Sequence, residues 1–351
     1  MFRRVLIGTL FVAAVRSFAV SVQADVFNMP SGQTSLQLVT VGDPGNLADT
    51  TGFGAVGYTY QIGKYDVTND QYCQFLNAVA TANDPYGLWN SYMQSSPNGG
   101  IICTGSGPFT YTVKSNQGNQ PVVWVTWFDT LRFANWLANG QGNGGTESGS
   151  YTLLGGTPTP SNAATIFQNP GATWVLPSEN EWYKAAYYKS GSTNAGYWIY
   201  PTQSDTPPAS QAPPGGSNSA NIWDVTTGYA VTHSTTEDFS TDYLTDVGAY
   251  SSSPGPYGTY DQGGDVFQWN EADMFGDGSS RGLRGGGFGG DSTYLASSYR
   301  NLYYGLPSRG YSEYGFRVGS VPEPSTLALL GVGALGLLGC AVRRRARSRQ
   351  T

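Results

Sequence analysis

The sequence predicts one α+β domain with few short helices, short strands and long loops. Three capped amphipathic segments indicate helices, and four short runs between them indicate strands. The composition agrees, because 48 of the 351 residues are Gly, 14% are aromatic and only 12% are charged. A coiled coil needs more charge, a disordered chain lacks such aromatic residues, and collagen needs a glycine period that is absent here.

Three segments carry the start signals of helices. Thr68 precedes a run over 69–80 whose apolar side chains recur at helical spacing. Two further helices are expected where a pair of residues matches a capping box: Thr126 with Asp129, and Ser178 with Glu181. In a capping box the side chain of the first residue accepts a hydrogen bond from the backbone of the second, and the side chain of the second accepts one from the backbone of the first.

The segments between these helices are short strands and loops. Four runs with β-like patterning are predicted as strands: 35–41, 58–62, 121–125 and 175–176. Three stretches rich in Gly, Ser, Asn and Pro are predicted as loops: 92–120, 140–172 and 190–220. We therefore assign residues 25–320 to one domain.

Residues 1–24 have the pattern of a secretory signal peptide. Two Arg residues precede an apolar run of 11 residues at 5–15, and Val22 and Ala24 are small enough to suit cleavage before Asp25. A short N-terminal membrane helix is the alternative interpretation.

Residues 321–351 form a second targeting segment. Pro322, Glu323 and Pro324 precede an apolar run of 16 residues at 327–342, and an Arg cluster follows. Such a run is at the short end of a membrane-spanning segment, and the arginines favour the cytoplasmic side. This tail resembles the PEP-CTERM sorting signal of Gram-negative bacteria. The resemblance implies transient anchoring in the inner membrane, cutting by an exosortase and delivery to the envelope or outside. An ordinary single-span tail is the alternative.

The charge of the body excludes one class of partner. Between residues 25 and 320 there are ten basic and 23 acidic residues, a balance of −13. Such a body repels phosphate backbones, so nucleic-acid binding is disfavoured, whereas Ca²⁺ is a suitable cation outside the cytoplasm. A disulfide between Cys73 and Cys103 is allowed in an exported protein, but the sequence leaves their pairing open.

Six blocks along the body resemble the formylglycine-generating enzyme family, also called sulfatase-modifying factors. They occur in the family's order at 65–69, 121–127, 174–182, 257–269, 284–288 and 315–318. Among them, the third contains Pro177-Ser178-Glu179 and the last reads Gly315-Phe316-Arg317-Val318. The resemblance covers about 35–320 and implies that family's variant of the C-type-lectin-like fold.

The resemblance does not extend to the family's redox centre. Formylglycine-generating enzymes oxidise a substrate cysteine with O₂ and a copper ion held by two cysteines. The matching positions here are Gly290 and Leu295, neither of which supplies the thiolate that Cu(I) prefers. The single histidine, His233, also excludes the His-cluster iron site of related sulfoxide synthases. Copper is therefore not expected.

The resemblance implies two structural Ca²⁺ sites. The first would use the side chains of Asp261 and Gln268 with the carbonyls of Gly264 and Val266. Gln268 stands where the family usually has Glu, which should weaken this site. The second would use the side chains of Asn221 and Asp242 with the carbonyls of Ile222 and Leu244. The alternative is that Asp261 and Asn221 only cap turns.

Two classes of function fit this sequence. The first is an exported, non-catalytic binding or structural module of the envelope or extracellular matrix. Its ligand would be an exopolysaccharide or a surface protein, gripped by loop aromatics such as Tyr294, Tyr299, Tyr303 and Tyr304. The second is an oxidoreductase-type enzyme that modifies proteins, related to formylglycine generation but with an altered active site. Arg284 and Arg317 are expected to pair with carboxylates.

Overall fold

The computed structural model of the chain describes residues 36–301 and 305–321. The expected signal peptide 1–24, the tail from Pro322 with its apolar run 327–342, and the aromatic residues Tyr303 and Tyr304 lie outside the described residues. Within the described ranges, no helix combines the length and the apolar character needed to cross a bilayer.

The three predicted helices, α1, α3 and α4, begin where the sequence places them. The helical segments are α1 (Asn69–Val79), α2 (Tyr92–Ser95), α3 (Trp127–Ala138) and α4 (Glu179–Tyr187), with 3₁₀ turns η1 (Ala163–Thr165) and η2 (Ser292–Leu295). The capping boxes of Thr126 and Ser178 are confirmed. Thr68 also forms a box, because the Gln71 side chain reaches back to its backbone N–H.

Strands are short and gather in small sheets. Their bounds are β1 (Leu38–Val41), β2 (Tyr60–Gly63), β3 (Ile101–Thr104), β4 (Thr110–Val113), β5 (Trp174–Val175), β6 (Ala209–Ser210), β7 (Ser219–Ala220), β8 (Trp223–Asp224), β9 (Gly228–Tyr229), β10 (Phe267–Asp273), β11 (Arg281–Arg284), β12 (Tyr314–Gly315) and β13 (Gly319–Ser320). The larger sheets have the orders β1-β2-β13-β5 and β11-β10-β12, and the rest are two-stranded. This confirms the α+β class with few short elements.

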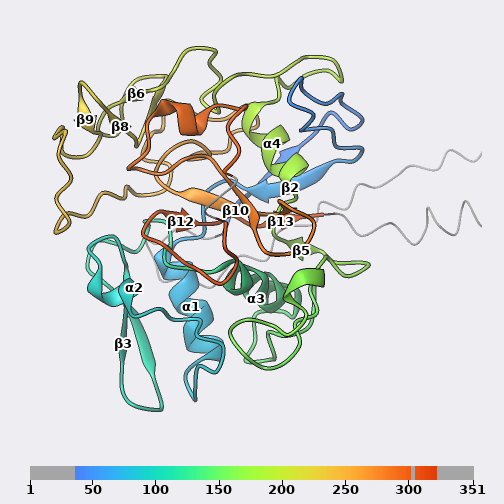
Figure 1. Ribbon diagram of the computed structural model, residues 1–351, viewed down its shortest axis with the longest axis vertical. Helices are drawn as coiled ribbons and strands as arrows, with labels where there is room; N and C mark the ends of the chain where they lie inside the picture. The colour runs from blue at the N-terminus through green and yellow to red at the C-terminus, as the bar shows by residue number, and fades with distance from the viewer. Residues whose placement is uncertain (1–35, 302–304, 322–351) are drawn as a thin grey trace, which may run out of the picture.

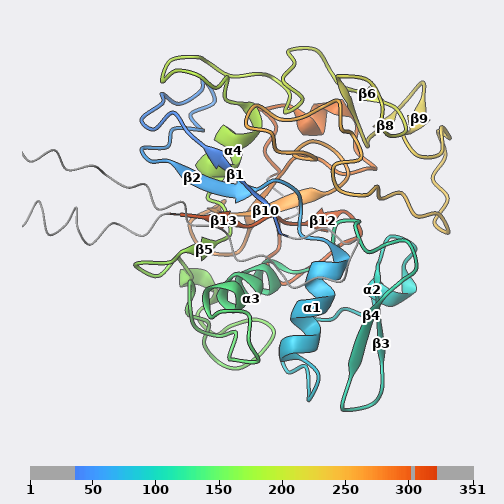
Figure 2. The same cartoon turned by 180° about the vertical axis from the view of Figure 1, so that it is seen from behind.

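The two larger sheets form the middle of the molecule. Figures 1 and 2 show α1 and α3 on one side of β10, β12 and β13, and α4 on the other side. The β3–β4 hairpin projects beside α1, whereas β6, β8 and β9 lie among the long loops at the opposite end. The helices therefore flank the two larger sheets, and the small two-stranded sheets lie outside them.

An aromatic core joins α1, α3 and the C-terminal strands. The ring of Phe133 lies 5.3 Å from Phe316, 5.4 Å from Phe75 and 5.6 Å from Trp136, measured between centroids. All four side chains are buried. The pairs of Phe133 with Phe75 and Phe316 are edge-on, and such pairs stabilise a core beyond the area they bury. Phe316, in the block at 315–318, therefore has a packing role.

The sequence prediction was wrong for the 121–125 strand, and it missed short elements in the predicted loops, including η1 in 140–172. Residues 121–125 do not pair as a strand, because Pro121 forms only an isolated bridge and Trp124 adopts a left-handed conformation at φ 65°. The predicted loop 92–120 contains α2 and the β3–β4 hairpin, and 190–220 contains β6 and β7.

Candidate functional site

The two positions that match the family's copper cysteines cannot bind a metal through their side chains. Leu295 is fully buried in an apolar cluster with Tyr200, Ala220 and Ile222. Gly290 has no side chain, and its carbonyl accepts a hydrogen bond of 3.0 Å from the Trp223 N–H. Because no soft donor stands at either position, these side chains do not fit copper.

The first set of expected calcium ligands is held in a hydrogen-bond network. The side-chain oxygen of Gln268 accepts from the Trp182 indole at 2.7 Å and from the Arg317 guanidinium at 2.6 Å. Its amide nitrogen donates to the Asp261 carbonyl at 2.6 Å. The Gly264 carbonyl accepts from the Val266 N–H at 2.8 Å. A cation already faces the Gln268 oxygen, so this residue does not fit as a Ca²⁺ ligand.

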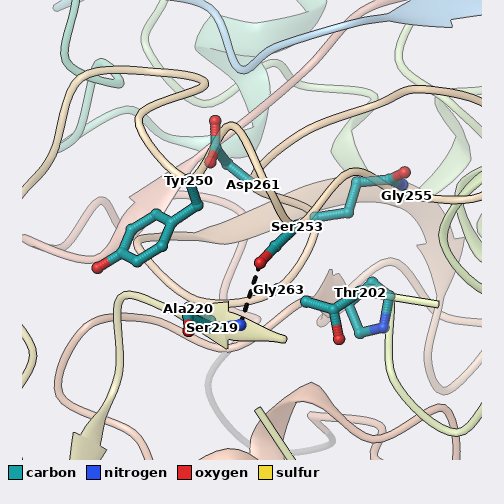
Figure 3. Close-up of a pocket in the computed structure, with 10 residues that line it drawn as sticks. Thr202, Ser219, Ala220, Tyr250, Ser253, Gly255, Asp261 and Gly263 are labelled. Carbon is teal, nitrogen blue, oxygen red and sulfur yellow. Dashed lines mark hydrogen bonds between the residues drawn. The ribbon is translucent and has the colours of Figure 1, made fainter. Parts of the chain in front are cut away.

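Asp261 nevertheless has an unusual environment. One of its carboxylate oxygens accepts from the Gly248 N–H at 2.6 Å. Burial raises the pKa of Asp261 to about 6, although this hydrogen bond and the nearby Arg317 oppose the shift. A small pocket lies beside this residue (Figure 3).

Backbone groups engage the Ser253 hydroxyl that lines this small pocket. This hydroxyl accepts from the Ser219 N–H at 3.0 Å (Figure 3) and donates to the Gly216 carbonyl at 2.8 Å. An activated serine nucleophile needs a base at that hydroxyl instead of a backbone carbonyl. The contacts of Ser253 are therefore those of a structural hydroxyl.

The oxygens of the second set of expected calcium ligands also accept hydrogen bonds from protein groups. Asp242 accepts from the side-chain amide of Gln120 at 2.9 Å and from the Leu244 N–H at 3.0 Å. The Leu244 carbonyl accepts from Gln120 at 3.2 Å. Asn221 lies near these residues, because its amide nitrogen donates to the Tyr243 carbonyl at 2.7 Å.

Ile222, the last member of this set, has its carbonyl occupied as well. It accepts from the Ala230 N–H at 3.0 Å and from the Ser210 hydroxyl at 2.7 Å. Across residues 36–301 and 305–321, no group of three or more His, Cys, Asp or Glu side chains is placed to hold a metal ion. Calcium binding stays a prediction that these contacts do not favour.

The loop aromatics named from the sequence are packed inward where the structure describes them. Tyr294 and Tyr299 lie 4.8 Å apart between ring centroids, and Tyr294 also contacts Phe267 at 6.1 Å. Both tyrosines pack against the main core. They do not form a free platform for a ligand.

A different surface has the features of a binding site. We call it the aromatic groove, and its lining residues are Asn90, Tyr92, Trp124, Ser308, Arg309, Gly310 and Tyr311. Tyr92 and Tyr311 expose 55% and 40% of their surface. Tyr92 stacks on Trp124 with centroids 4.6 Å apart and an interplanar angle of 22°. A flat aromatic surface next to polar groups suits a ligand with apolar faces and polar edges.

Trp124, which lines this groove, has a strained backbone conformation. Its φ of 65° is uncommon for a bulky residue and costs on the order of 1–3 kcal/mol. Its indole N–H is buried and has no hydrogen-bond partner in the described part of the chain. An unused donor at a strained position is a recurrent feature of ligand sites.

Backbone contacts hold the separate segments of the groove together. The Trp124 N–H donates to the Tyr311 carbonyl at 3.0 Å, and the Trp127 N–H donates to the Pro307 carbonyl at 3.1 Å. Gly310 permits this approach, because a Cβ there would lie 2.5 Å from the Trp124 carbonyl group. The groove therefore depends on the close contact of two loops.

Sequence reasoning missed this groove because its residues come from three distant segments. The pattern around Trp124 predicts a strand, and the pattern around Tyr92 predicts a loop without a partner. One local signal could have indicated a binding surface, because the segment 308–311 combines an aromatic residue and an Arg with Gly and Ser.

Together these features define a loop-rich α+β scaffold that carries the aromatic groove on its surface. The profile of the sulfatase-modifying factor enzyme 1-like domain matches residues 49–320, and the chain belongs to that family. The PEP-CTERM protein-sorting motif matches residues 320–345. This signal indicates export with transient membrane anchoring in a Gram-negative bacterium and implies processing by an exosortase-type enzyme.

Solved structures resemble the chain at low identity. Treponema denticola variable protein 1 is 18% identical, with a TM-score of 0.47, over 85% of this chain and 99% of that one. CarF is 22% identical, with a TM-score of 0.49, over 82% and 99%. PvdO from Pseudomonas aeruginosa is 19% identical, with a TM-score of 0.42, over 85% and 98%. Among curated proteins, none matches the chain.

Proposed function

We propose that this protein is a non-catalytic binding module that acts in the cell envelope or the extracellular matrix and holds a glycan in its aromatic groove. The observation that carries the proposal is the exposed stack of Tyr92 on Trp124, at 4.6 Å and 22°. Sugar rings present C–H faces that pack on such a surface and hydroxyl groups that seek donors and acceptors.

The polar rim of the groove suits this ligand class. Asn90 and Ser308 line it and can exchange hydrogen bonds with sugar hydroxyls. An apolar peptide ligand would leave these groups without partners, which costs binding energy.

Export and release complete the proposal. We propose that residues 1–24 are removed on export and that the tail 321–351, with its apolar run 327–342, anchors the body until an exosortase-type enzyme cuts near Pro322, Glu323 and Pro324. The PEP-CTERM match at 320–345 supports this order of events. The groove then faces the polysaccharide or the surface proteins outside the cell.

Binding of the bacterium's own exopolysaccharide to the exported protein tests the proposal. Tyr92→Ala and Tyr311→Ala should each lower the affinity about tenfold, because each removes an exposed aromatic contact worth more than 1 kcal/mol. Phe239→Ala is the matched control, since Phe239 is 83% exposed and does not line the groove. Unchanged affinity in both tyrosine variants, or no binding by the wild type, would overturn the proposal.

A further inference from the structure

We propose that the glycan bound in the aromatic groove is acidic, with a uronate carboxylate that pairs with Arg309; this inference rests on the proposed function. Arg309 lines the groove beside Tyr311 and Ser308 and is exposed. Its backbone N–H donates to the Leu306 carbonyl at 3.0 Å, which fixes the turn that presents the side chain.

Arg309 differs from every other cation of the body. The structure describes all ten basic side chains between residues 25 and 320, and nine of them contact a carboxylate, a carbonyl or an aromatic ring. These nine are Lys64, Lys114, Arg132, Lys184, Lys189, Arg281, Arg284, Arg300 and Arg317. Within residues 36–301 and 305–321, Arg309 alone has no such partner for its side chain.

This isolation is unexpected on an acidic protein. With 23 acidic residues against ten basic ones between 25 and 320, a free guanidinium has many potential carboxylate partners on its own surface. A guanidinium binds a carboxylate with two parallel hydrogen bonds, and its planar fork makes this geometry specific. The carboxylate partner that Arg309 lacks among the described residues is therefore assigned to the ligand.

The rest of the groove sets the kind of molecule that carries this carboxylate. Tyr92 and Trp124 offer a stacked platform, and Asn90 and Ser308 offer neutral polar contacts. A uronate ring has one apolar face, several hydroxyls and one carboxylate, which matches these three kinds of contact. The negative body repels a polyanion at a distance, so the attraction has to come from this local pair.

The test compares a polyuronate with the same polymer after chemical reduction of its carboxyl groups. The wild-type protein should bind the polyuronate roughly ten- to a hundredfold more tightly, the usual range for a hydrogen-bonded charged group. Arg309→Met should bind the reduced polymer more tightly than the polyuronate, because only the repulsion between the acidic body and the carboxylates remains. Arg309→Lys should keep part of it, and Lys189→Met, a control cation paired with Asp205, should leave it unchanged.

The outcomes separate this inference from the proposed function. One outcome is that the wild type binds both polymers equally, that Tyr92→Ala abolishes this binding and that Arg309→Met does not change it. This result would overturn the inference that the ligand is acidic and would leave glycan binding in place. Binding of polyglutamate as tight as that of polyuronate would show that charge alone is recognised, which also overturns it. Failure of both polymers to bind the wild-type protein would remove the proposed function itself.

Discussion

The carboxylate of Glu179 lies 2.7 Å from the guanidinium of Arg284, and both side chains are almost fully buried. This ion pair links the first turn of α4 to β11 and confirms the expected carboxylate partner of Arg284. Arg300 contacts the same carboxylate at 2.6 Å from a more exposed position. Glu179 is therefore the only carboxylate in contact with two guanidinium groups in the described part of the chain.

Removing this carboxylate should be costly. Glu179→Gln leaves Arg284 buried without a countercharge, and we expect the free energy of unfolding to fall by about 3–5 kcal/mol. Arg300→Gln should cost only about 1 kcal/mol, because Arg300 is 28% exposed and Arg284 still neutralises Glu179. Urea unfolding of the two variants measures both values. Equal losses of unfolding free energy in the two variants would show that the buried Glu179–Arg284 pair does not stabilise the fold more than the exposed Arg300 contact does.

A second carboxylate makes stability depend on pH. Glu313 lies against Gly287 and Gly289, and a Cβ at Gly289 would lie 2.7 Å from its carboxylate. Burial raises the pKa of Glu313 to about 7, and the charge of Glu237 adds to this shift. The folded protein therefore keeps a proton on Glu313 at a pH where the unfolded chain has lost it.

The sign of this effect can be measured. The stability linked to Glu313 is fully present at a pH below the carboxyl's ordinary pKa and is lost as the pH rises through about 7. Glu313→Gln cannot ionise, so relative to the wild type it should gain about 2 kcal/mol between pH 5 and pH 8. Asp277→Asn, at a fully exposed carboxylate, is the control and should not gain. A constant difference between wild type and Glu313→Gln at both pH values would contradict the prediction.

Local signals explain why the helices were predictable. Thr126 and Asp129 are three residues apart, and the side chain of each accepts a hydrogen bond from the backbone N–H of the other. The start of α3 is therefore determined by a few neighbouring residues. Trp124 shows the limit of this reasoning. Its sequence neighbours favour a strand, but the contact with Tyr311 and Gly310 imposes a left-handed backbone that no local pattern indicates.

The expected calcium ligands show a related limit of sequence reasoning. The resemblance supplied Gln268 as a metal ligand, yet its oxygen accepts from Trp182 and Arg317, which come from distant segments. Arg309 was not predicted as a site residue, whereas Gln268 was. The proposed role of Arg309 rests on the lack of a side-chain partner within residues 36–301 and 305–321, which only the three-dimensional contacts of the other nine cations reveal.

The two described cysteines are free thiols, and their reactivity should differ. Cys73 is buried on α1, and burial raises the pKa of its thiol to about 12. Cys103 on β3 is partly exposed. Iodoacetamide should therefore label Cys103 first in the native protein, as read by peptide mass spectrometry. Labelling of neither residue before reduction would instead establish a disulfide between them.

Calcium binding can be tested through thermal stability. Since Gln268 and Asp242 already accept hydrogen bonds, we expect neither Ca²⁺ nor a chelator to change the melting temperature of the exported protein. A ligand present at a hundred times its Kd would add about 2.7 kcal/mol, which such a measurement detects easily. A chelator-sensitive shift that Asp261→Asn removes would restore the first calcium site.

The geometry of the aromatic groove should depend on Gly310. Its backbone φ is not positive, so the requirement for glycine comes from the approach to Trp124, whose carbonyl would lie 2.5 Å from a new Cβ. Gly310→Ala should push residues 308–311 away from the Tyr92–Trp124 stack. We expect a loss of about 1–3 kcal/mol in unfolding free energy.

The same displacement should weaken ligand binding, because Tyr311 and Arg309 move with the loop. Gly57→Ala is the matched control, since Gly57 is exposed and a Cβ added there would have no heavy atom within 4 Å. Urea unfolding and polysaccharide affinity, measured on both variants, separate the two effects. If Gly310→Ala behaves like Gly57→Ala in both measurements, the two loops are not coupled through this contact. If only stability falls, the position of residues 308–311 does not determine recognition, and the ligand lies on the Tyr92 side of the groove alone.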